Sequence, residues 1–280
     1  MYYQIEKMDG YYRIGSPENV FCYLITGTER AMLIDTGYGF GDLRGAVRSV
    51  TEKPLLIVNT HGHCDHVSGN GQFEETCFIH EQDMELCREH SSRKMRVGSM
   101  ENARHSRNFE TGELYNALPE DFDEEAYLGR GAGNLRAVKD GDIFELGRAT
   151  MEIMETPGHT KGGISIFYRE KNLLFVGDAA GAFVWLFGKE SAGREVHIRT
   201  LKKMYAMAAD GYISAHNPNI MRREDFPRYI RAAEEADYEK GEPFDSPFSK
   251  ETKPRVCALD GMTVKDLFRP DFAAVVISEE

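Results

Sequence analysis

The chain has 280 residues, and its 34 lysines and arginines against 46 aspartates and glutamates give a formal net charge of −12. An overall field of this sign repels a phosphate backbone, so the composition disfavours a nucleic-acid-binding protein. The 41% share of hydrophobic residues, with charges of both signs, is typical of a globular protein and excludes a disordered or fibrous chain. At this length one large domain or two small ones are both possible.

Targeting signals and disulfides are not expected. The longest apolar run, residues 181–187, is far shorter than the roughly 20 residues of a membrane helix. The first ten residues lack the basic and then apolar pattern of a signal peptide. The five cysteines are odd in number and irregularly spaced, as expected for reduced thiols. These features predict a cytoplasmic protein that does not bind membranes.

Strands and short helices alternate in the first sixty residues. β-Branched and aromatic residues predict a hairpin with strands at 20–26 and 31–34. Apolar residues on one face predict a short helix over 42–50. The apolar run LLIV at 55–58 predicts a buried strand, which ends at a histidine-rich turn.

The second half of the chain shows the same kinds of segment. Alternation of apolar and polar residues predicts strands within 137–153 and at 164–168, and the apolar run LLFV predicts a buried strand at 173–176. Helices are expected at about 194–209, ended by Gly211, and at about 226–240, and late strands near 255–259 and 272–277.

Residues 84–136 interrupt this alternation, and we interpret them as an insertion. Residues 88–107 carry six basic and two acidic groups, whereas residues 108–129 carry seven acidic groups and no basic one. One interpretation is a pair of solvated helix faces that partly neutralise each other. The other is a lid whose basic side chains meet an anionic substrate. The basic candidates for substrate contact are Arg93, Arg96, Arg104 and Arg107.

A dense group of metal-ligand side chains follows the strand at 55–58. His61, His63, Asp65 and His66 lie within six residues. Buried together without a partner, they would repel one another as cations or stay unsatisfied. Neutral imidazole and ionised carboxylate are ligands that Zn²⁺ prefers, so this turn predicts a metal site.

Three further candidates also lie at the ends of strand-like segments. They are His159 in TPGHT, Asp178 after LLFVG and His216 after an apolar segment. We expect the remaining histidines to be surface groups: His80, His90, His105 and His197. Cys64, between ligands, is interpreted as a spacer rather than a nucleophile.

Five elements together resemble the metallo-β-lactamase superfamily of metallo-hydrolases. They are LIDTG at 33–37, THGHCDH at 60–66, TPGHT at 156–160, GDAA at 177–180 and the late His216. The resemblance implies an α/β fold, a four-layer αββα sandwich formed by a single domain over residues 1–280, with the 84–136 segment as a mainly helical insertion or lid.

The resemblance also implies two divalent metal ions, with zinc expected and manganese or iron as alternatives. It implies that His61, His63 and His159 hold the first ion, that Asp65, His66 and His216 hold the second, and that Asp178 bridges them. It implies that Asp35 orients a ligand or the local backbone from outside the metal contacts.

Two identities separate the chain from known branches of that family. Asp178 stands where the best-known lactam-hydrolysing branch has a cysteine, and His63 stands where the di-iron flavoprotein branch usually has glutamate. A true β-lactamase and an oxygen reductase are therefore disfavoured. The acidic composition disfavours the nuclease branches.

The function that the resemblance implies is hydrolysis by a metal-bridged hydroxide. The substrate would be the ester, thioester or lactone of a small molecule, and the basic half of the insertion suggests an anionic one. Asp65 would orient the hydroxide and pass a proton to the leaving group. Phe183, Trp185 and Phe187, just after Asp178, form either a wall of the substrate pocket or ordinary core.

Three alternatives stay open at this point. The chain could be a mononuclear iron enzyme that oxidises thiols or persulfides, a phosphodiesterase, or a non-catalytic ligand-binding protein that the metal stabilises. Substrate identity and oligomeric state are not predicted.

Overall fold

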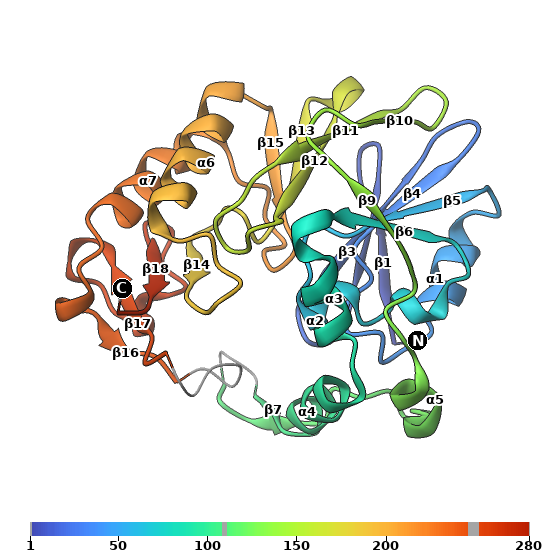
Figure 1. The fold of residues 1–280 in the computed structure, drawn as a ribbon, viewed down its shortest axis with the longest axis horizontal. Coiled ribbons are helices and arrows are strands. Elements are labelled where there is room, and N and C mark those ends of the chain that lie inside the picture. Colours follow the sequence, from blue (N-terminus) through green and yellow to red (C-terminus); the bar gives the residue numbers. More distant parts are fainter. Residues whose placement is uncertain (1, 108–110, 246–251, 280) are drawn as a thin grey trace. The chain divides into compact units, whose positions relative to one another are not determined.

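The computed structural model describes residues 2–107, 111–245 and 252–279 (Figure 1). The chain forms two compact units, residues 1–153 and 154–280, and each combines β-strands with helices. The expected mixed α/β class is confirmed. Within the described ranges, none of the helices has the length and apolar character needed to cross a membrane.

A seven-stranded mixed sheet forms the centre of the first unit. Its order is β1 (Gln4–Lys7), β2 (Tyr12–Gly15), β3 (Phe21–Thr26), β4 (Ala31–Ile34), β5 (Leu55–Val58), β6 (Thr76–His80) and β9 (Asn134–Val138). Neighbours are antiparallel from β1 to β4 and parallel from β4 to β9. The strands predicted at 31–34 and 55–58 match β4 and β5.

One face of this sheet packs against helix α1 (Leu43–Val50), as the apolar face predicted for 42–50 requires. The Asp42 side chain begins the helix by accepting a hydrogen bond from the Gly45 amide. Leu43 and Val47 are fully buried in the cluster that includes Leu33 of β4 and Ile57 of β5. Both faces of β4 and most of β5 are buried, which explains their continuous apolar runs.

The segment predicted as an insertion, residues 84–136, combines helices with short strands. It contains α3 (Met84–His90), α4 (Arg93–Arg104), the short strands β7 (Ser106–Arg107) and β8 (Leu114–Tyr115), and α5 (Glu124–Gly129). Met100 of α4 and Tyr127 of α5 share a buried cluster with Phe40. The chain returns to the large sheet in β9, which begins at Asn134, inside the range expected for the insertion.

The chain passes from the first unit to the second within β11 (Thr150–Glu155), which forms a hairpin with β10 (Ile143–Glu145). In the second unit, β12 (Ile164–Tyr168) is antiparallel to β13 (Leu173–Gly177), and β13 is parallel to β15 (Gly211–Ser214). A second sheet has the order β14 (Phe183–Leu186), β18 (Ala274–Ile277), β17 (Arg255–Ala258) and β16 (Glu242–Pro243).

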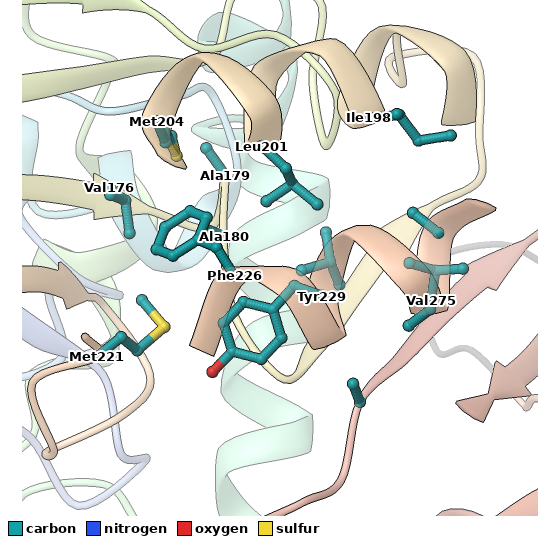
Figure 2. Close-up of a cluster of buried hydrophobic side chains, with 14 of the residues drawn as sticks. Val176, Ala179, Ala180, Ile198, Leu201, Met204, Met221, Phe226, Tyr229 and Val275 are labelled. Carbon is teal, nitrogen blue, oxygen red and sulfur yellow. The ribbon is translucent and has the colours of Figure 1, made fainter. Parts of the chain in front are cut away.

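Two helices, α6 (Arg194–Met207) and α7 (Phe226–Glu234), lie side by side in the second unit (Figure 1). Figure 2 shows their apolar side chains meeting strand residues in one core, with Leu201 of α6, Phe226 of α7 and Val275 of β18 among them. This burial requires apolar residues along one face of each helix.

The ends of both helices differ from the prediction. Helix α6 ends at Met207, and the next residue, Ala208, adopts a left-handed conformation with φ of 53°. The expected terminator Gly211 begins β15 instead. Helix α7 stops at Glu234. Beyond it, Tyr238–Lys240 form a separate 3-10 helix that begins after Asp237. The Asp237 carboxylate accepts the Glu239 amide, which stabilises a new start rather than a continued helix.

Candidate metal centre

Four of the predicted ligands lie on the turn that follows β5 in the first unit. His61 Nε2 and His63 Nδ1 are 3.0 Å apart, and the His61 and His66 rings lie with their centroids 4.0 Å apart. Asp65 Oδ2 is 3.6 Å from His66 Nε2. The turn thus gathers nitrogen and oxygen donors of the predicted kind within a few ångströms.

Asp35 holds this turn from the neighbouring strand. Because β4 and β5 are parallel, their carboxyl ends lie at the same sheet edge, and Asp35 follows β4 as Thr60 follows β5. The buried Asp35 carboxylate accepts hydrogen bonds from the Thr60 amide (2.7 Å) and hydroxyl (2.8 Å) and from His66 Nδ1 (2.8 Å).

This hydrogen bond selects the tautomer of His66. Nδ1 carries the proton that is donated to Asp35, so Nε2 keeps a lone pair for a metal. Asp35 itself adopts a φ of 60°, a conformation that aspartate and asparagine tolerate better than most residues. The contacts agree with the orienting role that the resemblance implies for Asp35.

The other three predicted ligands lie at one edge of the β12–β13–β15 group in the second unit. Asp178 follows β13, and His216 lies just beyond the end of the parallel strand β15. Asp178 Oδ2 is 3.3 Å from His216 Nε2 and 3.7 Å from His159 Nε2. One carboxylate oxygen therefore lies within reach of two imidazoles.

Backbone contacts fix the His159 ring. Its Nδ1 donates to the carbonyl of Trp185 at 2.7 Å, so Nε2 is the nitrogen that faces Asp178. Gly158, just before it, packs against α6, where a Cβ atom would lie 2.8 Å from Nδ1 of His197. The TPGHT loop therefore requires glycine at this position.

His197 corrects one sequence-based expectation. It is buried in α6 rather than exposed, since only 1% of its surface is accessible. Burial, with a smaller contribution from the nearby His159, lowers the pKa of His197 to about 3. Its imidazole is therefore neutral at physiological pH and acts as packing behind the TPGHT loop. The prediction of a surface position weighed only the charged and helical surroundings of His197, although its direct neighbours, Val196 and Ile198, are apolar.

The donor chemistry in each unit fits divalent metal ions. Imidazole and carboxylate are the ligands that such ions take, and hydrogen bonds to Asp35 and to the Trp185 carbonyl orient two of the imidazoles. The Cys64 thiol does not belong to this set. Burial, and then the charge of Asp65, raises its pKa to about 12, so it stays protonated and a nucleophilic role is disfavoured.

Among the basic residues, Arg96 contradicts the prediction of a substrate contact. It is fully buried, and its guanidinium donates to the carbonyls of Ser68 (2.9 Å) and Ser91 (3.1 Å). It also lies over the Tyr127 ring, with 5.0 Å to the centroid. Arg96 is therefore part of the packing between the insertion and the turn that follows the ligands.

The other three arginines are exposed. Arg104 is paired with Glu101 (2.6 Å) and with Glu124 of α5 (2.7 Å), which supports mutual neutralisation of the basic and acidic halves. Arg93 begins α4, and Arg107 donates to the Gly112 carbonyl.

The aromatic run after Asp178 lies on β14 and just beyond it. Val184 and Leu186 belong to the core that contains α6 and α7. Because successive side chains of a strand face opposite sides, Phe183, Trp185 and Phe187 belong to a different cluster. Phe187 is buried, and Phe183 and Trp185 are half-buried. The Trp185 ring contacts those of Phe187 and Phe244, with centroids 5.5 and 5.2 Å apart.

Comparison with known proteins agrees with this geometry. The family model described as the metallo-beta-lactamase superfamily matches residues 15–216. The chain is 27% identical over 186 residues to an acyl-coenzyme A thioesterase, MBLAC2, of Bos taurus, covering 60% of each chain. It spans about 60% of the length of that relative.

A shorter match joins the chain to a hydroxyacylglutathione hydrolase of Hyphomonas neptunium, 47% identical over 47 residues, which cover 17% of this chain and 18% of the other. Among solved structures, a metallo-beta-lactamase family protein from Thermus thermophilus has a TM-score of 0.52 at 23% identity, covering 81% of this chain and 78% of the other. That likeness shows a shared fold.

We predict that Asp35→Asn weakens metal binding. Asparagine tolerates the same backbone conformation, but its amide places a donor where the carboxylate accepts hydrogen bonds from Thr60 and His66. The Kd for zinc, measured by chelator competition, should rise about 10- to 100-fold. The free energy of unfolding should fall by about 1–3 kcal/mol. Wild-type zinc affinity in this variant would contradict the orienting role.

A second prediction concerns acid stability. The pKa of His197 is about 3 in the folded chain, and an unfolded histidine titrates near ~6.5. As the pH falls below ~6.5, His197 gains a proton in the unfolded state but not in the folded state, so the free energy of unfolding falls. In metal-free protein, His197→Gln should reduce the loss of unfolding free energy at about pH 5, relative to neutral pH, by about 2 kcal/mol. Equal losses in variant and wild type would contradict a neutral, buried His197.

Proposed function

The chain belongs to the metallo-β-lactamase superfamily, and from this premise we propose that it is a metal-dependent hydrolase of thioesters. The observation that carries the proposal is the set of imidazole and carboxylate donors at the strand ends of each unit, with Asp178 Oδ2 within reach of two imidazoles. The thioester class is supported by two relatives, whose names describe an acyl-coenzyme A thioesterase and a hydroxyacylglutathione hydrolase.

We assign the seven ligands to two divalent ions, with zinc as the expected metal. His61, His63 and His159 would hold one ion, and Asp65, His66 and His216 the other, with Asp178 shared between them. When bound, such ions polarise a carbonyl oxygen and lower the pKa of water to near neutrality. The hydrogen bonds that His66 donates to Asp35 and His159 donates to the Trp185 carbonyl support ligation through Nε2 in both.

Asp65 is the residue proposed to handle the proton. Its carboxylate would orient the attacking oxygen, accept the proton released as the carbon–oxygen bond forms, and deliver it to the leaving thiolate. Asp65 lies in the first turn of the short helix α2 (Cys64–Val67), next to His66. Hydrolysis of the thioester then yields one carboxylate and one thiol without a protein nucleophile.

Substrate contacts are proposed from two regions. The half-buried rings of Phe183 and Trp185 would contact the acyl group, because the Trp185 backbone already contacts the ligand His159. Arg93 and Arg107 are the exposed cations proposed to meet an anionic part of the substrate. Arg96 is not proposed as a substrate contact, because its side chain is fully buried.

A thioester panel tests the proposal. Acyl-coenzyme A and S-acylglutathione should release free thiol, measured with a thiol-reactive dye, faster than the matched oxygen esters are cleaved. The rate should vanish after chelation and return with zinc. Asp65→Asn should lower kcat about 10²- to 10⁴-fold. The exposed carboxylate of Asp210 gives the matched control, Asp210→Asn, which should keep the wild-type rate.

Two results would contradict the proposed function. One is the absence of thiol release from every thioester in the panel by metal-loaded protein. The other is a rate that chelation leaves unchanged.

A further inference from the structure

The residues that follow β6 contact the backbone of the metal-binding turn. They form the 3-10 helix η2 (Glu81–Asp83) and the first helix of the insertion, α3. The Gly62 amide donates to Asp83 Oδ2 at 3.0 Å, and the Cys64 amide donates to His90 Nδ1 at 3.2 Å. Asp83 and His90 therefore accept hydrogen bonds from Gly62 and Cys64, the two residues that lie between the predicted ligands of this turn.

The hydrogen bond from the Cys64 amide to His90 supplies an acceptor at the start of α2 that the helix's own N-cap residue does not provide. This helix has four residues, and the side chain of its N-cap residue, His63, makes no capping hydrogen bond. The first amides of a helix have no partner within the helix and need acceptors from elsewhere. His90 provides one for Cys64, from the last turn of α3. So short a helix gains little from its own hydrogen bonds, and external contacts must fix its direction.

Close packing reinforces both hydrogen bonds. A Cβ atom on Gly62 would lie 2.9 Å from the Asp83 carbonyl oxygen and 2.9 Å from the Cys87 amide nitrogen. Backbone of η2 and α3 thus lies directly against the turn, and glycine is required between His61 and His63.

The His90 ring also lies against the His63 ring. Their centroids are 5.1 Å apart and their planes differ by 25°. Because Nδ1 accepts the Cys64 amide, a neutral His90 carries its proton on Nε2. This residue therefore supports a predicted ligand in two ways, by stacking on its ring and by accepting from the next amide in the chain.

We propose that Asp83 and His90 are positioning residues that hold the turn in the conformation that binds metal, an inference that rests on the proposed ligand role of the turn. The sequence did not indicate it. Asp83 and His90 lie 21 and 26 residues beyond their partners, and His90 was expected at the surface. The insertion thereby takes part in forming the metal site through its first helix.

Paired variants separate the hydrogen bonds from packing. His90→Phe keeps a stacking ring and removes the acceptor, whereas His90→Asn keeps an acceptor near the position of Nδ1. In the same way, Asp83→Ala removes the acceptor and Asp83→Asn keeps one. The zinc Kd, measured by chelator competition, should rise about 10- to 100-fold in His90→Phe and Asp83→Ala. It should stay near the wild-type value in the two asparagine variants.

The Tm of the metal-free proteins is measured alongside. We expect His90→Phe and His90→Asn to have similar metal-free Tm values while differing in zinc affinity. Wild-type affinity in all four variants would overturn this inference alone. If zinc binding were weakened equally in His90→Phe and His90→Asn, with equal losses of metal-free Tm, His90 would act through packing, and this inference would also be overturned. Failure of the wild-type chain to bind zinc would overturn the proposed function, and this inference with it.

Discussion

The Asp35 carboxylate is the contact on which the metal-binding turn most depends. It accepts three hydrogen bonds from Thr60 and His66, and so ties the end of β4 to the residues after β5. A buried carboxylate that lost these donors would be left with a large desolvation cost, so the contact and the turn stabilise each other. Asp83 and His90 hold the same turn from the side of the insertion.

Strand direction explains why donors distant in sequence gather within each unit. In the first unit, β4 and β5 are parallel, so Asp35 and the histidine-rich turn share a sheet edge. In the second, β13 and β15 are parallel, and Asp178 and His216 follow their carboxyl ends. The amino end of the antiparallel strand β12 lies at that edge too, just after the TPGHT loop.

Much of this was readable from sequence because it is local. The strands at 55–58 and 164–168 match β5 and β12, since their apolar runs are bounded by turn residues. The donors were recognised by residue type together with their position after strand-like segments, and the resemblance to the superfamily assigned them to the two ions. The burial of Arg96 and the inward position of His197 depend instead on tertiary contacts, because a charged or polar side chain is buried only where another segment meets it. No local periodicity reports such contacts.

Anomalous diffraction from crystals of protein purified without added metal tests the central claim most directly. The account predicts two zinc peaks about 3.5–4 Å apart. One should lie within ligand distance of His61, His63 and His159, and the other of Asp65, His66 and His216, with Asp178 bound to both. A single iron peak, or zinc peaks bound by other residues, would contradict it.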